Sequence, residues 1–163
     1  NDPANDAFLF NQGMTKGLGN IQFHDYSLAY DSVDLPNVAV FKEQIALFKE
    51  MLFNARPTDE QVKDIDFLLN VGELFTLVAY GQLIIENARI YGLEDDVVDQ
   101  IFDFMIRDFS RFALQVYAKT SSSEQQMAYC LKMIKKPTVN VERFERVWRQ
   151  YAYALTDAYE MNS

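Results

Sequence analysis

Residues 67–85, FLLNVGELFTLVAYGQLII, decide the fold of this chain. The segment is nearly long enough to cross a bilayer as a helix. It also contains Asn70, Gln82 and Glu73, and a carboxylate in mid-helix costs on the order of 3 kcal/mol in lipid. No basic flank or aromatic belt follows it. We therefore expect a central helix that several neighbours bury, and no membrane span.

This segment belongs to a predicted helix that starts at Thr58 and ends before Gly92. Thr58 and Gln61 have the spacing of a capping box, and Gly92 suits the C-terminal cap. One apolar stripe of the helix includes small residues that would let another backbone come close. Its members are Val62, Ile65, Leu69, Gly72, Thr76, Ala79 and Leu83.

Apolar residues at steps of three and four predict two further long helices. The first begins at Pro36, ends at Arg56 before Pro57, and places Val38, Phe41, Ile45, Phe48 and Leu52 on one face. The other opens with acidic residues at 94–96, which suit the positive end of a helix dipole. Its stripe contains Val98, Ile101, Met105, Phe109, Phe112 and Val116.

Two shorter helices are predicted towards the end of the chain. Residues 121–124, SSSE, form a linker and capping box before a helix that stops at Pro137. We expect it to point Met127, Leu131 and Ile134 inward. Asn140 caps the last helix, which runs to about residue 159. Its apolar stripe consists of Phe144, Trp148, Tyr151 and Leu155.

The sequence thus predicts an all-α bundle of about five helices over residues 36–163. Residues 1–35 are rich in Asn, Asp and Gly, and we expect an irregular N-terminal arm there with a short helical turn near residues 25–31. The chain starts without Met, which suggests a processed protein or a piece of a longer one.

Composition narrows the class of function. A chain of 163 residues with a net charge of −9 repels phosphate backbones and anionic membranes, so nucleic acid is not an expected partner. A single cysteine cannot form an internal disulfide, and residues 1–15 lack the features of a signal peptide. We expect a cytoplasmic protein.

Few residues suggest chemistry. His24 is the only histidine and Cys130 the only cysteine, which argues against a di-iron or zinc site. A pairing of His24 with Cys130 as base and nucleophile would need the fold to bring them together, and we expect Cys130 in the core. The glycines at 13, 17 and 19 lack the spacing of a phosphate loop and indicate a turn.

Two features leave alternatives open. Glu73 lies in the most apolar helix, where burial would raise its pKa and could make it an acid. Alternatively, Glu73 faces a gap or pairs with Arg89, Arg107 or Arg111. A basic cluster suggests a phosphate site or a site for an acidic partner, or simply a solvated face. Its members are Lys132, Lys135, Lys136, Arg143, Arg146 and Arg149.

Several segments resemble the late part of bacterial FAD-dependent acyl-CoA dehydrogenases. They are GLGNIQFHDY at 17–26, DFLL at 66–69, GELFTLV at 72–78, YGQLI at 80–84, DQIFD at 99–103, RDFS at 107–110, RFERVW at 143–148 and AYEMN at 158–162. The Tyr-Glu-Gly-Thr segment that often holds the catalytic base of such enzymes is absent.

The resemblance implies the C-terminal helical domain of a flavoprotein that desaturates acyl-CoA thioesters with FAD bound elsewhere. It assigns no catalytic, cofactor-binding or metal-binding residue to this chain. The implied partners are the catalytic body of the parent enzyme and further copies of the same subunit. The alternatives are a stand-alone helical interaction module and a small bundle enzyme that uses Glu73.

Overall fold

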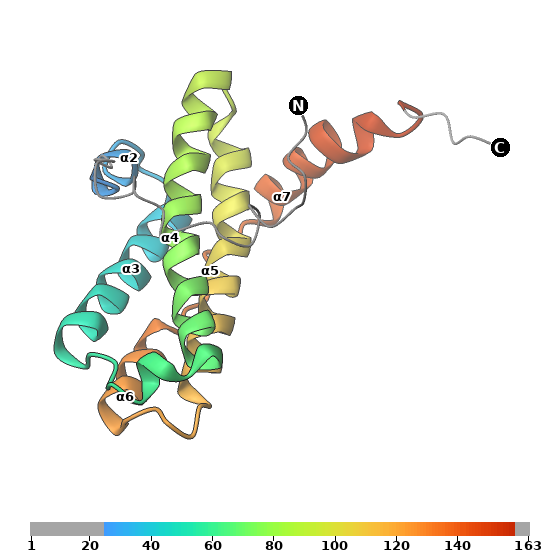
Figure 1. Ribbon diagram of the computed structural model, residues 1–163. Helices are drawn as coiled ribbons and strands as arrows, with labels where there is room; N and C mark the ends of the chain where they lie inside the picture. The colour runs from blue at the N-terminus through green and yellow to red at the C-terminus, as the bar shows by residue number, and fades with distance from the viewer. Residues whose placement is uncertain (1–24, 159–163) are drawn as a thin grey trace, which may run out of the picture.

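A computed structural model describes residues 25–158, which form an all-α bundle with no strand in that part of the chain, so the predicted fold class is confirmed. The helices are α2 (Ser27–Tyr30), α3 (Pro36–Asn54), η2 (Gln61–Lys63), α4 (Ile65–Tyr91), α5 (Asp95–Tyr117), α6 (Glu124–Met133), α7 (Val141–Val147), the π-helical η3 (Trp148–Ala152) and η4 (Tyr153–Leu155). Figure 1 shows α3, α4 and α5 as long rods, with α6 at one end and α7 projecting sideways.

Helix α5 lies at the centre of the bundle, because α3, α4, α6 and α7 all pack against it. Its predicted stripe is largely correct: Val98, Met105, Phe109 and Val116 are buried, and Phe102 is buried beside them. Asp95 and Asp96 lie in the first turn, where the positive end of the helix dipole favours them.

An aromatic cluster joins the elements at this centre. The ring of Phe41 on α3 lies 5.3 Å from Phe102 and 5.5 Å from Phe109, both edge to face. Tyr30 of α2 completes the cluster, and its hydroxyl donates a hydrogen bond of 2.6 Å to the carbonyl of Val78. Burial raises the pKa of Tyr30 well above its ordinary value. The helical turn expected near residues 25–31 is therefore present as α2 and is part of the core.

The prediction that residues 67–85 form a central, buried helix is wrong. Helix α4 packs against α5 and α2 along one side only. The buried residues are Phe67, Leu74, Val78, Gly81, Ile85 and Ala88. The stripe expected to face the interior lies on the opposite side, with Ile65, Leu69 and Leu83 exposed. A helix that is apolar on all sides gives no sequence signal for which side faces the core.

The start of α4 also differs from the prediction, whereas its end does not. Thr58 and Gln61 do exchange the two hydrogen bonds of a capping box, but these bonds close the turn that leads into the short η2, whose N-cap is Glu60. Asp64 caps α4 by accepting hydrogen bonds from the backbone of Asp66 and Phe67. Gly92 ends the helix in the left-handed conformation that glycine adopts without strain, as predicted.

In α6 the inward face is shifted by one residue from the prediction. The buried residues are Gln126, Cys130 and Met133, whereas Leu131 and Ile134 are exposed. The shift arises because a glutamine occupies the interior: the side chains of Gln126 and Gln61 hydrogen-bond each other at 2.9 and 3.0 Å. A polar residue that finds a buried partner does not show in an apolar pattern.

Candidate assembly surface

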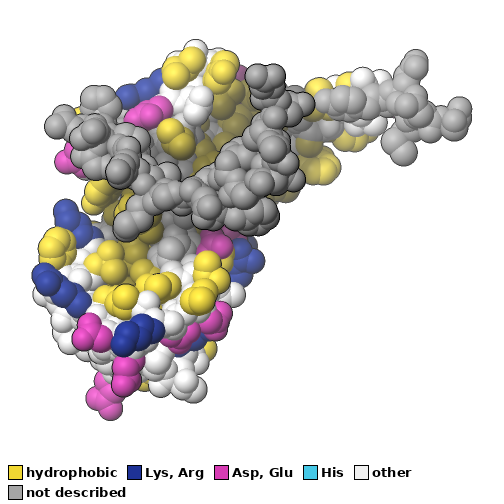
Figure 2. Space-filling view, in the orientation of Figure 1, with side chains coloured by type: hydrophobic (Ala, Val, Ile, Leu, Met, Phe, Trp, Pro, Cys, Tyr) yellow, Lys and Arg dark blue, Asp and Glu magenta, His cyan; other side chains and the backbone are white. Residues whose placement is uncertain are grey.

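The outer face of α4 is an apolar stripe without a cover among the described residues. Ile65 is 73% exposed, Leu69 63% and Leu83 52%, and Gly72, Thr76 and Ala79 between them are exposed too. Figure 2 shows hydrophobic side chains gathered on this side of the molecule, with charged groups around them. Large exposed apolar patches on a folded domain mark places where another molecule packs.

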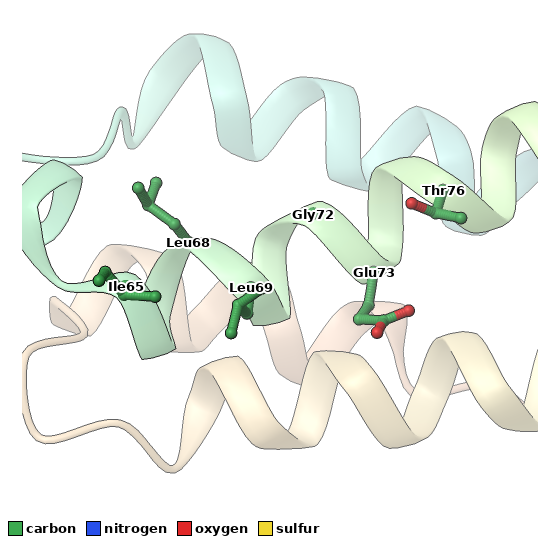
Figure 3. Close-up of a pocket in the computed structure, with 6 residues that line it drawn as sticks. All are labelled: Ile65, Leu68, Leu69, Gly72, Glu73 and Thr76. Carbon is green, nitrogen blue, oxygen red and sulfur yellow. The ribbon is translucent and has the colours of Figure 1, made fainter. Parts of the chain in front are cut away.

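The first half of this face forms a shallow groove of about 450 Å³. Its lining residues all belong to α4 and are drawn in Figure 3: Ile65, Leu68, Leu69, Gly72, Glu73 and Thr76. A side chain at Gly72 would meet nothing within 4 Å, so the middle of the groove is open. Such a surface accepts an apolar side chain or a closely packed helix.

Glu73 is exposed at this groove and is not buried as the acid hypothesis required. It has no ion pair within residues 25–158, because the three arginines predicted as possible partners contact other residues. Arg107 pairs with Asp103 at 2.8 Å, Arg111 pairs with Asp108 at 3.2 Å, and Arg89 reaches the carbonyl of Ser32. Among the described residues, Glu73 is therefore an exposed carboxylate without a cation, beside an apolar surface.

The last described segment, residues 141–155, forms an arm that leaves the bundle (Figure 1). The apolar stripe predicted for this segment does not pack into the bundle. Phe144 is 47% exposed, Trp148 54% and Leu155 52%, and Tyr151 lies between them. The rings of Phe144 and Trp148 stack with centroids 6.4 Å apart. The arm thus presents a second apolar surface with a preformed aromatic pair.

A buried polar network fixes the root of this arm. Arg143 is 3% exposed; it forms an ion pair with Asp99, lies 3.7 Å from Asp103, and hydrogen-bonds Gln100. Asn37 of α3 donates from its backbone to Asp99 at 2.8 Å. The sequence offered one signal of this site, namely carboxylates four residues apart on α5 beside its apolar stripe.

Two exposed contacts continue along the arm. Arg146 donates to Asp96 at 2.6 Å, and Gln150 donates to Glu94 at 3.0 Å. The hydrogen bond from Arg146 holds the pKa of the Asp96 carboxyl below its ordinary value. The partners on the α5 side come earlier in the sequence as the arm proceeds, so the arm runs antiparallel to α5 towards the α4–α5 turn.

The predicted basic cluster does not form one surface for a phosphate or an acidic partner. Arg143 is buried with carboxylates, Arg146 pairs with Asp96, and Lys135 pairs with Glu43 at 3.1 Å. Lys132 lies over the ring of Tyr129, and Arg149 is 3.7 Å from Glu145. The chain's own acidic groups neutralise most of these charges, and Lys136 is exposed apart from them.

The remaining candidates give no catalytic centre within residues 25–158. Cys130 is fully buried with its sulfur 4.0 Å from that of Met51, and burial raises the pKa of the thiol to about 11. The core position predicted for it is confirmed. His24 and the glycines at 13, 17 and 19 lie outside the described residues. No three His, Cys, Asp or Glu side chains gather at a possible metal position in the described part.

No family model, curated protein or solved structure matches this chain. By length and composition alone, α4 is one helix that could cross a membrane, a test that core helices also pass. The dehydrogenase resemblance and the expected absence of a membrane span both remain predictions.

Proposed function

We propose that this chain is the C-terminal helical assembly domain of a cytoplasmic FAD-dependent acyl-CoA dehydrogenase, and that the outer stripe of α4 packs on the catalytic body. The observation that supports this most is the exposed apolar stripe on the longest helix. Fully burying one leucine or isoleucine contributes about 1.5–3 kcal/mol. Ile65, Leu69 and Leu83 are 73%, 63% and 52% exposed, so covering the three would contribute roughly 3–6 kcal/mol before the entropy of association.

The parent's chemistry is assigned to residues outside this chain. The groove at α4 is open, lined mainly by apolar side chains, and has Glu73 as its charged group. A carboxylate there repels the pyrophosphate of FAD, so this groove does not fit the flavin. In this proposal the domain shapes and holds the enzyme, and the catalytic body desaturates the acyl-CoA thioester.

The groove itself favours a second candidate, a stand-alone helical interaction module. An amphipathic helix from a partner would lie along residues 65–76 with its apolar face on Leu68 and Leu69. The exposed apolar residues extend well past this groove, to Leu83, Ile90 and Tyr91 near the end of α4. That extent agrees better with a broad interface to a catalytic body than with one peptide groove.

The coding region upstream of Asn1 tests the proposal directly. We expect a flavin-binding dehydrogenase body in the same reading frame, and Leu69→Glu with Leu83→Glu in that whole protein should loosen the domain and reduce activity. A start codon directly before Asn1 would contradict the dehydrogenase assignment. A stoichiometric yellow complex of FAD with this chain alone would contradict the placement of the flavin contacts elsewhere.

A further inference from the structure

Two apolar surfaces of this chain lack a cover among the described residues. One is the α4 groove, lined by Ile65, Leu68, Leu69, Gly72, Glu73 and Thr76. The other is the arm stripe, formed by Phe144, Trp148, Tyr151 and Leu155. The first is a shallow groove with an open middle, and the second carries a stacked aromatic pair.

The two surfaces of one molecule lie at different ends of the α4–α5 pair. Arg143 is held at Asp99, near the start of α5, and that start adjoins the end of α4 across the turn at Gly92. The groove lies at the start of α4, roughly 25 Å away at 1.5 Å per helical residue. From Arg143 to Gln150 the arm contacts progressively earlier residues of α5, so it runs away from the groove.

The charged residues beside the two apolar surfaces have opposite signs. Glu73 at the groove has no ion pair within residues 25–158. Arg149, next to Trp148 on the arm, is largely exposed and makes only a 3.7 Å contact with Glu145 on its own helix. Glu73 and Arg149 therefore place opposite charges beside the two apolar surfaces.

We propose that the arm of one copy packs into the α4 groove of a second copy, in a reciprocal exchange that forms a twofold dimer. Each large aromatic side chain buries about 150–250 Å². The four arm residues are between 36% and 54% exposed, so two exchanged arms lose roughly 800 Å² of accessible surface. The α4 surfaces that they cover lose a similar area, and together the two approach the roughly 1,600 Å² of a standard stable interface. A twofold exchange also covers both grooves at once and leaves no open end for further growth.

This inference rests on the proposed assembly role, and it names a second copy as a partner of the groove. It gives Ile65 and Leu69 to that second copy, and the catalytic body of the parent then contacts Leu83 and the exposed Ile90 beyond the groove. The two ideas fail separately. If the chain is a dimer but no flavoprotein is encoded upstream, only the dehydrogenase assignment is rejected. If the chain is a monomer and a flavoprotein is encoded upstream, only the reciprocal exchange of arms is rejected.

The test is the mass of the full 163-residue chain by sedimentation. We expect a dimer whose melting temperature rises with protein concentration. Trp148→Glu should give a folded monomer whose melting no longer depends on concentration. Phe104→Glu, at an exposed aromatic on α5, is the matched control and should stay dimeric. A monomeric wild type, or a Trp148→Glu variant that stays dimeric, overturns the proposal.

Cross-linking tests the geometry without a charge in the interface. One tagged copy has Leu69→Cys and a differently tagged copy has Trp148→Cys, while the buried Cys130 stays unreactive. Mild oxidation of the mixture should link the two tags. A disulfide within one chain of the double variant would overturn the exchange. A vesicle flotation assay tests for a membrane at the groove. If the wild type floats with phosphatidylcholine vesicles and Leu69→Glu does not, the groove binds a membrane and the exchange is overturned.

Discussion

Helices α4 and α5 pack side by side. From composition, the more apolar α4 would be expected at the centre of the bundle and the more polar α5 at its surface, but the structure has them the other way round. Helix α4 is apolar on nearly every side and has only a few buried residues. Helix α5 is rich in aspartates, and it contacts α3, α4, α6 and α7. Helix α5 occupies the centre because it has one well-defined apolar face and its buried polar side chains form hydrogen bonds and ion pairs. The excess of apolar residues on α4 therefore indicates a contact beyond this fold.

The largest expected effect comes from the aromatic core around α5. Phe102→Ala removes a fully buried ring that packs on Phe41 and Tyr30, so we expect a loss of about 4 kcal/mol in the free energy of unfolding. Phe75→Ala is its match on the exposed side of α4 and should change that free energy by less than about 0.5 kcal/mol. Urea unfolding followed by circular dichroism measures both. Equal losses would remove the distinction between the two helices.

A smaller loss should follow from the polar network of α5. Arg143→Met leaves Asp99 buried without its cation, and we expect about 3 kcal/mol of destabilisation. This value is at the low end for a buried pair, because Arg107 still pairs with Asp103. The control is Arg149→Met, which removes an exposed pair and should cost about 0–1 kcal/mol. An Arg143→Met variant as stable as the wild type would show that this network does not fix the arm.

These residues also show what the sequence could predict. The helices at α3 and α5 and their inward stripes followed from spacing, because each has one apolar face opposite a polar one. The burial of Cys130 followed from its apolar context. The orientation of α4 did not follow, because a helix that is apolar all round has no preferred side. The burial of Gln126 and Arg143 was not predicted, because their buried partners, Gln61 and Asp99, are distant in sequence.

The candidate surface was predictable only in part. The small residues Gly72, Thr76 and Ala79 were expected to receive another backbone, and the structure leaves them exposed. The arm stripe was expected from its spacing, whereas its position outside the bundle depends on contacts with α5. The basic cluster was defined from charge alone, and neutralisation by Asp96, Asp99 and Glu43 is a property of the fold.

Two glycines on opposite sides of α4 should respond with opposite signs. A methyl group at Gly81 would collide with the hydroxyl of Tyr30 and lie 3.2 Å from Met105, so Gly81→Ala should cost about 2 kcal/mol. Gly72→Ala meets nothing within 4 Å and should stabilise the helix by up to about 1 kcal/mol. Thermal unfolding of the two variants measures this difference. Both variants are compared at a protein concentration low enough to keep the chain monomeric, because the partner's arm would cover Gly72 in the proposed dimer. A loss at Gly72 in the monomer would mean that the outer face already packs against this chain.

The smallest effect on folding, and the most direct test of the account, is expected from Leu69→Glu combined with Leu83→Glu. Both side chains are exposed on the outer stripe, so the helical content by circular dichroism should be unchanged. The measurement is the mass of the full chain by sedimentation, beside Leu74→Glu on the buried side, which should unfold the protein. The account predicts that the double variant stays folded and loses its assembled mass. A folded double variant with an unchanged mass, or one that unfolds as Leu74→Glu does, would contradict it.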